Sequence, residues 1–245
     1  MRVAVVGKGG AGKTTLAGTL ARVLARRGRK VLAIDLDTNP GLAYTLGMPP
    51  VDDGLPDEAL EESEDRPTAP YGWRLASGLT PADAVERFSV KGPDGVRFIS
   101  PGKIDRDKDI VRRNITAVQQ IARGFDEPEW DVIGDLEAGS TTPYEGYVAF
   151  ARRALLVVTP GWTSGLMARR LLPILGDVPT LIVASRFSNG SAHPDLTPDA
   201  NIPYDENLAE ADHLGVAPLD HCPAAPGVRA IEELAGRLVA EEART

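Results

Sequence analysis

A glycine-rich segment near the N-terminus carries the strongest chemical signal in this sequence. Residues 7–14, GKGGAGKT, match the pattern G-x-x-x-x-G-K-[ST] in full. Glycines let backbone N–H groups approach phosphate oxygens, Lys13 can neutralise the β- and γ-phosphates, and the Thr14 hydroxyl can ligate Mg²⁺. The segment therefore predicts a nucleoside triphosphate site whose phosphates are held by Gly7, Gly9, Gly10, Ala11, Gly12, Lys13, Thr14 and Thr15.

Carboxylates follow two other apolar runs. Asp35 and Asp37 come after residues 31–34, and Asp135 comes after residues 130–134. Open α/β sheets bind ligands beyond the carboxyl ends of their strands, so we expect these acids near the phosphates. A hydrogen-bonded turn is the alternative for Asp37, and a capping role is the alternative for Asp135.

The elements that must position these groups alternate between strand and helix. The apolar run 2–6, the helical spacing of 14–27 and the run 31–34 form a βαβ unit. We therefore predict an α/β fold with a mostly parallel, doubly wound sheet, typical of a P-loop NTPase. The whole chain, 1–245, is expected to be a single domain with an acidic surface excursion at about 48–80 that contains a short acidic helix. Further strands are predicted at 96–100, 130–134, 154–159, 179–184 and 200–203, and helices at 110–123, 165–175, 205–214 and 228–242.

Composition restricts the partners of the chain. Its 245 residues include 27 Lys and Arg against 35 Asp and Glu, a net charge of −8. An acidic chain binds nucleic acid and anionic lipid poorly, although arginines at 22–29 leave a local DNA-binding patch as an alternative. The single cysteine, Cys222, excludes an internal disulfide. With neither a signal peptide nor a long apolar run in view, we expect a cytoplasmic protein.

The loop contains a second lysine, Lys8, directly after its first glycine, and this lysine points to a known family. GKGGAGKTT resembles the deviant P-loop of the MinD/ParA/nitrogenase-iron-protein ATPases. That resemblance implies that Lys8 reaches the nucleotide of a facing subunit, so that ATP holds a homodimer together; a solvated loop lysine is the alternative. It also implies that Asp37 orients the attacking water, Asp35 lies near the Mg²⁺ shell, Asp135 holds a Mg²⁺-bound water and Gly139 senses the γ-phosphate. The expected catalytic residues are Lys8, Lys13 and Asp37, and the expected metal-binding residues are Thr14, Asp35 and Asp135.

Recognition of the base is expected from two later segments. Pro203 and Asp205 lie in a stretch, IPYD, that resembles the adenine-side loop of the same family. Arg186 follows a predicted strand and either stacks on the base or lies on the surface. The sequence has no Asn-Lys-x-Asp guanine signature, which favours ATP over GTP.

Within the family, the segments 135–139 and 202–219 most resemble the carbon monoxide dehydrogenase maturation ATPases, which are nickel-insertion partners. Their Cys-x-Cys pair is absent, since residues 104–109 are IDRDKD, and His213, His221 and Cys222 lack metal-ligand spacing. The resemblance implies a Mg-ATP-dependent homodimer switch that serves an unidentified maturation or assembly partner. The alternatives are a ParA-like DNA-positioning ATPase and a P-loop kinase or ligase acting on a small molecule. The acidic tail at 231–245 argues against membrane docking.

Overall fold

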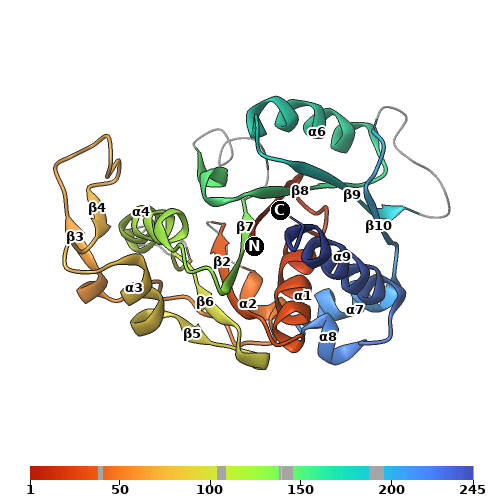
Figure 1. The fold of residues 1–245 in the computed structure, drawn as a ribbon, viewed down its shortest axis with the longest axis horizontal. Coiled ribbons are helices and arrows are strands. Elements are labelled where there is room, and N and C mark those ends of the chain that lie inside the picture. The colour runs from red at the N-terminus through yellow and green to blue at the C-terminus, as the bar shows by residue number, and fades with distance from the viewer. Residues whose placement is uncertain (38–40, 104–108, 138, 140–145, 188–195, 245) are drawn as a thin grey trace.

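A central eight-stranded sheet organises the protein (Figure 1). The computed structural model describes residues 1–245 except 38–40, 104–108, 138, 140–145, 188–195 and 245. The strand order is β10-β9-β8-β1-β7-β2-β6-β5, and every neighbouring pair is parallel except β5 and β6. The mostly parallel sheet is therefore confirmed. Its strands are β1 (Arg2–Gly7), β2 (Lys30–Leu36), β5 (Val90–Lys91), β6 (Arg97–Ile99), β7 (Trp130–Leu136), β8 (Arg153–Val158), β9 (Thr180–Phe187) and β10 (Ala200–Pro203).

Helices cover both faces of this sheet, as a doubly wound fold requires. Along β1, Val3 and Val5 pack on one face with α1, α2 and α9, whereas Ala4 and Val6 pack on the other with α3, α4 and α6. Side chains alternate between the faces of a strand, so a fully apolar run such as residues 3–6 satisfies both cores. The helices are α1 (Lys13–Arg26), α2 (Leu42–Thr45), α3 (Pro81–Phe88), α4 (Asp109–Gly124), α6 (Trp162–Leu175), α7 (Glu206–Leu214), α8 (Pro218–His221) and α9 (Pro226–Glu242), with 3₁₀ turns η1 (Asp57–Ala59), η2 (Pro93–Gly95) and η3 (Tyr147–Phe150).

The direction of winding reverses beside β1. Strands β7, β2 and β6 extend the sheet to one side of β1, and β8, β9 and β10 extend it to the other. Open α/β sheets bind ligands at such a reversal, beyond the carboxyl ends of the strands. The loop that leaves β1 therefore lies at the point of the sheet where the topology favours a ligand site.

The acidic excursion differs from its prediction. The expected short helix is wrong: only the single turn η1 forms, and it is followed by an antiparallel hairpin of β3 (Leu60–Glu62) and β4 (Trp73–Leu75). Leu60 and Leu75 face each other in register and are both buried in the cluster that contains α4. The side-chain carbonyl of Gln120 on α4 also accepts a hydrogen bond from Leu75 N at 2.9 Å. Packing against α4 thus outweighs the local preference of the acidic segment for a helix.

None of the helices in the described part of the chain is long and apolar enough to cross a bilayer. The prediction of a single domain stays a prediction, although strands from residue 2 to residue 203 share one sheet.

The closest packing in the middle of the sheet gives a stability test. An added Cβ on Gly134 of β7 would lie 2.4 Å from Cζ of Phe150. We expect Gly134→Ala to lower the free energy of unfolding by about 1–3 kcal/mol, because a rigid ring must move. Adding Phe150→Leu should cost less in the Gly134→Ala background than in the wild type. Urea unfolding of the four proteins measures this coupling.

Gly78→Ala is the matched control, because nothing lies within 4 Å of its added Cβ. It should change the stability by no more than about 0.5 kcal/mol. Equal effects of the two glycine substitutions would contradict the packing account.

Candidate functional site

The loop between β1 and α1 has a backbone that only glycine tolerates at its key positions. Gly10 and Gly12 have φ of +72° and +91°, in the left-handed region. Gly7 has φ of +146°, and a Cβ there would meet the carbonyl oxygen of Val157 on neighbouring β8 at 2.5 Å. The predicted glycine-rich loop thus adopts its curved path against β8, at the carboxyl edge of the sheet.

The end of this loop is built to receive an anion. Gly12 is the N-cap of α1 and offers no side chain to the first turn. The N–H groups of that turn remain available, and the helix dipole adds partial positive charge. Lys13 is only 7% exposed at the same point. In contrast, Lys8 is exposed, and its carbonyl oxygen accepts a hydrogen bond from Ala11 N at 3.2 Å.

Two buried carboxylates lie behind the loop. Asp35 and Asp135 are paired in register on the adjacent parallel strands β2 and β7, and they are 0% and 2% exposed. Both strands run further than the predicted runs 31–34 and 130–134, so these acids lie inside the sheet edge instead of beyond it. The cause is that β2 and β7 continue their ladder to Leu36 and Leu136.

Asp35 organises the segment that follows it. Its Oδ1 accepts a hydrogen bond from Asp37 N at 3.0 Å, and its Oδ2 accepts from Gly41 N at 3.0 Å and Leu42 N at 2.9 Å. Burial raises the pKa of Asp35 to about 6 despite these donors. We therefore assign Asp35 a positioning role, and its predicted place near the metal shell stays a prediction.

Asp135 has the environment of a cation ligand. The Thr14 hydroxyl donates to its carboxylate, and Lys13 is close enough to favour its ionised form. Burial and the neighbouring Asp35 nevertheless raise the pKa of Asp135 to about 8. Its Oδ1 is buried with no hydrogen-bond partner among the described residues, which is costly unless another ligand binds.

A hydroxyl and a carboxylate offer the oxygen donors that Mg²⁺ prefers. Among the residues that the structure describes, no group of three His, Cys, Asp or Glu side chains is gathered to hold a metal. Mg²⁺ does not require such a cage, because it keeps several waters and shares phosphate oxygens. Thr14 and Asp135 therefore fit the predicted ion.

Asp37 and Gly139 lie next to segments outside the described residues. Asp37 follows β2 directly and is half-buried. Gly139 has φ of +109°, and its N–H donates to the carbonyl oxygen of Gly7 at 3.3 Å. A role for that N–H in sensing phosphate would require the bond to Gly7 to break. The predicted roles of both residues stay predictions.

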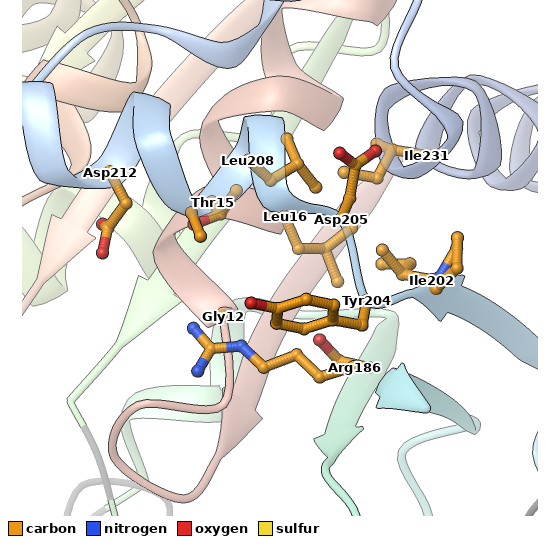
Figure 2. Close-up of a pocket in the computed structure, with 13 residues that line it drawn as sticks. Gly12, Thr15, Leu16, Arg186, Ile202, Tyr204, Asp205, Leu208, Asp212 and Ile231 are labelled. Carbon is orange, nitrogen blue, oxygen red and sulfur yellow. The ribbon is translucent and has the colours of Figure 1, made fainter. Parts of the chain in front are cut away.

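A pocket of about 280 Å³ opens beside the loop, on the side of β9 and β10 (Figure 2). It brings together residues that are distant in the sequence: Gly12, Thr15, Leu16, Ser185, Arg186, Ile202, Pro203, Tyr204, Asp205, Leu208, Ala209, Asp212 and Ile231. Its size and its mixture of apolar and polar lining groups suit a planar base. The predicted base-side residues Arg186, Pro203 and Asp205 all line it.

A β-bulge aims Arg186 at this pocket. Ile202 pairs with Ser185 and Pro203 with Phe187, so Arg186 is the extra residue on β9. Its φ is +61°, which is unusual for a residue with a side chain. Bulges of this kind often redirect a side chain beside a functional site. Arg186 is exposed, and Figure 2 shows its side chain extending below the ring of Tyr204.

Two residues of the IPYD segment differ from the sequence-based picture. The Asp205 carboxylate is the N-cap of α7 and accepts from Asn207 N at 3.0 Å and Gly227 N at 2.8 Å. These donors hold the pKa of Asp205 below its ordinary value. Tyr204, which sequence reasoning did not select, presents a 57% exposed ring in the pocket. An aromatic residue directly after the predicted strand 200–203 was the signal available in the sequence.

The other candidates of the sequence have ordinary surroundings. Arg22 and Arg26 both pair with Asp94 and Asp220. These arginines are therefore neutralised, which disfavours a DNA-binding role for their cluster. His221 contacts Glu210 at 3.4 Å, and Cys222 is a half-buried free thiol.

Asp135→Asn should show how much the buried charge of Asp135 lowers the free energy of unfolding. The pKa of Asp135 is higher in the folded protein than its ordinary value of about 4. The folded state thus binds this proton more tightly, and the stability contributed by the protonated form is lost as pH rises from about 4 through about 8. Without nucleotide, the variant should be about 1–3 kcal/mol more stable than the wild type at pH 8, and the difference should shrink toward pH 4. Urea unfolding across this pH range measures it.

Asp131→Asn is the control, because Asp131 is equally buried on β7 but is paired with Arg29 at 2.7 Å. That substitution should destabilise the protein at pH 8. Mg-ADP should raise the melting temperature of the wild type much more than that of Asp135→Asn. A destabilised, nucleotide-free Asp135→Asn protein at pH 8 would contradict the account.

Comparison with known proteins agrees with this geometry. The chain is 27% identical over 249 residues to the carbon monoxide dehydrogenase accessory protein CooC of Rhodospirillum rubrum, covering 91% of each chain. The septum site-determining protein MinD of Pyrococcus horikoshii OT3, solved with Mg-ADP, superposes with a TM-score of 0.73 at 20% identity, covering 97% of this chain and 95% of that one. A ParA family ATPase from Chlorobium tepidum TLS gives a TM-score of 0.71 at 18% identity, covering 96% and 97%.

The similarity to the two solved structures concerns the fold, and the family is established by a wider match. The model of the CobQ/CobB/MinD/ParA nucleotide binding domain matches residues 3–219, which include the glycine-rich loop, both buried acids and the lining of the base-side pocket apart from Ile231. The resemblance inferred from the loop is thus confirmed, and the chain belongs to the CobQ/CobB/MinD/ParA nucleotide-binding domain family of P-loop ATPases.

Proposed function

We propose that this protein is a Mg-ATP-dependent homodimer switch that hydrolyses ATP to ADP and phosphate. The observation that carries the proposal is Asp135, a buried carboxylate with a free oxygen, bonded to Thr14 directly beneath the phosphate-binding loop. That arrangement is costly in the empty protein and becomes favourable once a cation and phosphates arrive. Binding energy is therefore available to bias a conformational equilibrium.

In this proposal, the loop N–H groups and Lys13 hold the β- and γ-phosphates, and Thr14 and Asp135 hold Mg²⁺. The bound Mg²⁺ supplies charge neutralisation at the phosphate oxygens. Asp37 orients the attacking water, while Asp35 holds the backbone at Asp37 and at residues 41–42 through three hydrogen bonds. Lys8 is exposed and reaches the nucleotide of a second copy, adding positive charge to the transferring group.

ATP is the proposed nucleotide. Arg186 and Tyr204 offer flat surfaces to a base, and Pro203 lines the same pocket. Asp205, which the sequence placed at the base, supports this wall by capping α7 and bonding Gly227. Such a pocket contacts the flat faces of a base more than the hydrogen-bonding groups at its edge.

We further propose that the switch serves a maturation or assembly partner. The support is the similarity, over 91% of each chain, to CooC, an accessory protein of carbon monoxide dehydrogenase. The chain has no Cys-x-Cys pair at 104–109, so a thiolate metal bridge between subunits is not proposed. The predicted cytoplasmic location is part of the same proposal. DNA positioning is less favoured because Arg22 and Arg26 are already paired with acids.

Hydrolysis should depend on Lys13. Lys13→Ala removes the buried cation of the loop, and we expect phosphate release from Mg-ATP to fall by at least about 100-fold. Lys30→Ala is the control, because Lys30 pairs with Glu129 on the surface and should leave turnover unchanged. Malachite-green assays and melting temperatures separate loss of activity from loss of folding. Turnover that survives Lys13→Ala in a folded protein would refute the assignment of the site.

Dimerisation should depend on the nucleotide and on Lys8. In Asp37→Ala, slow hydrolysis should trap the closed state, so light scattering should report a doubled mass with Mg-ATP and a monomer with Mg-ADP. Adding Lys8→Ala should abolish the doubling, since the cross-subunit contact is lost. Lys30→Ala in the same background should retain it.

A monomer in Mg-ATP would remove the cross-subunit role of Lys8 and leave a small-molecule kinase or ligase as the better hypothesis. A dimer that forms and also retains DNA in a salt-sensitive, ATP-dependent manner would favour the ParA-like alternative.

A further inference from the structure

A single hydroxyl joins helix α2 to the first turn of α1. Thr45, the last residue of α2, is 9% exposed, and its Oγ1 lies 3.1 Å from the carbonyl oxygen of Thr14 and 2.9 Å from that of Leu42. A hydroxyl carries one proton, so the two carbonyl oxygens share it. The bond to Leu42 stays within α2, whereas the bond to Thr14 reaches a residue that is proposed to hold Mg²⁺.

Helix α1 leaves room for this contact at one position. An added Cβ on Gly18 of α1 would lie 2.7 Å from Cβ of Thr45. Glycine in the middle of a helix is unfavourable relative to alanine, because it costs more backbone entropy and buries no side chain. The glycine at position 18 therefore lowers the local stability of α1 but allows α2 to approach closely enough for the hydroxyl of Thr45 to reach Thr14.

The other end of α2 is held by Asp35. Its Oδ2 accepts hydrogen bonds from Gly41 N and Leu42 N, and its Oδ1 accepts from Asp37 N. A helix of four residues is not stable alone, so α2 takes its position from contacts with the rest of the protein. Burial of Leu42 is one of them, but apolar burial has no direction, whereas hydrogen bonds do. The hydrogen bonds at its two ends therefore fix where α2 lies relative to α1.

These contacts connect the proposed metal ligands to the proposed water-orienting residue. The hydroxyl of Thr14 donates to Asp135, its carbonyl oxygen accepts from Thr45, and Asp35 holds both the start of α2 and the N–H of Asp37. We propose that Thr45 is a positioning residue for ATP hydrolysis, whose hydroxyl fixes α2, and through it Asp37, relative to the phosphates and Mg²⁺ at Thr14. This inference rests on the proposed function. Because the hydroxyl donates to carbonyls of the protein itself, its removal should slow turnover and leave nucleotide affinity nearly unchanged.

Two substitutions of Thr45 test the role of the hydroxyl. Thr45→Val removes it and keeps the shape of the side chain, and we expect kcat for Mg-ATP hydrolysis to fall about tenfold while the Kd for Mg-ADP stays within about threefold of the wild type. Thr45→Ser retains the hydroxyl and should keep kcat within about threefold of the wild type. Phosphate-release assays and calorimetry measure the two constants.

Thr116→Val is the matched control. Thr116 of α4 is 3% exposed, and its hydroxyl has no hydrogen-bond partner among the described residues. The same chemical change at a buried site away from the loop should leave both constants unchanged. Melting temperatures confirm that each variant is folded, and Thr45→Ala, which leaves space instead of filling it, provides the same comparison if valine prevents folding.

A double-mutant cycle with Asp37 separates positioning from a general structural role. If Thr45 acts through Asp37, Thr45→Val should slow single-turnover hydrolysis little further in the Asp37→Ala background, because residues that act as a unit are not additive. An equal loss in both backgrounds, an unchanged kcat in Thr45→Val, or a loss of Mg-ADP affinity as large as the loss of kcat would overturn the inference and leave the proposed function intact. A wild type that releases no phosphate from Mg-ATP would refute the proposed function and the inference with it.

Discussion

The structure depends on two buried carboxyl groups held side by side. Asp35 and Asp135 lie in register on adjacent parallel strands and are almost completely excluded from solvent. Burial raises the pKa of both carboxyl groups. The charge of Asp35 raises the pKa of Asp135 further, and the charge of Asp37 raises that of Asp35. A sheet interior does not tolerate such a pair without compensation. Three backbone donors compensate Asp35, whereas Asp135 has Thr14, Lys13 and an oxygen left over. The empty protein thus contains an energetic deficit that a cation and an anion together can relieve.

The rest of the fold brings the other groups to this pair. The central place of β1 puts the glycine loop beside the strand that carries Asp135, and contact with β8 at Gly7 fixes the path of the loop. On the far side of β8, the bulge in β9 turns Arg186 into the base-side pocket. Helix α7 starts at the capped Asp205 and contributes to the same pocket. The phosphates and the base therefore each have a candidate partner from a different segment of the chain.

The acidic excursion shows how tertiary packing can override a local tendency. Its many acids favour a solvated helix, yet the hairpin β3–β4 forms because Leu60 and Leu75 can be buried together on α4. Gln120 and Asn114 of α4 accept hydrogen bonds from the backbone of the same excursion. These two contacts join residues 45 and 59 positions apart in the sequence, a separation that local patterns do not register.

The sequence by itself determined the parallel α/β fold, the phosphate loop and the acids beside it. Those features depend on local chemistry: apolar runs predict strands, helical spacing predicts α1, and glycines with Lys13 and Thr14 suit phosphate wherever a strand precedes a helix. Only the tertiary structure decided what each acid does. Asp35 became a backbone anchor, Asp135 kept a free oxygen and Asp205 became a helix cap. These roles depend on strand register and on distant donors such as Gly227 N, and a linear pattern does not encode which backbone group meets which carboxylate.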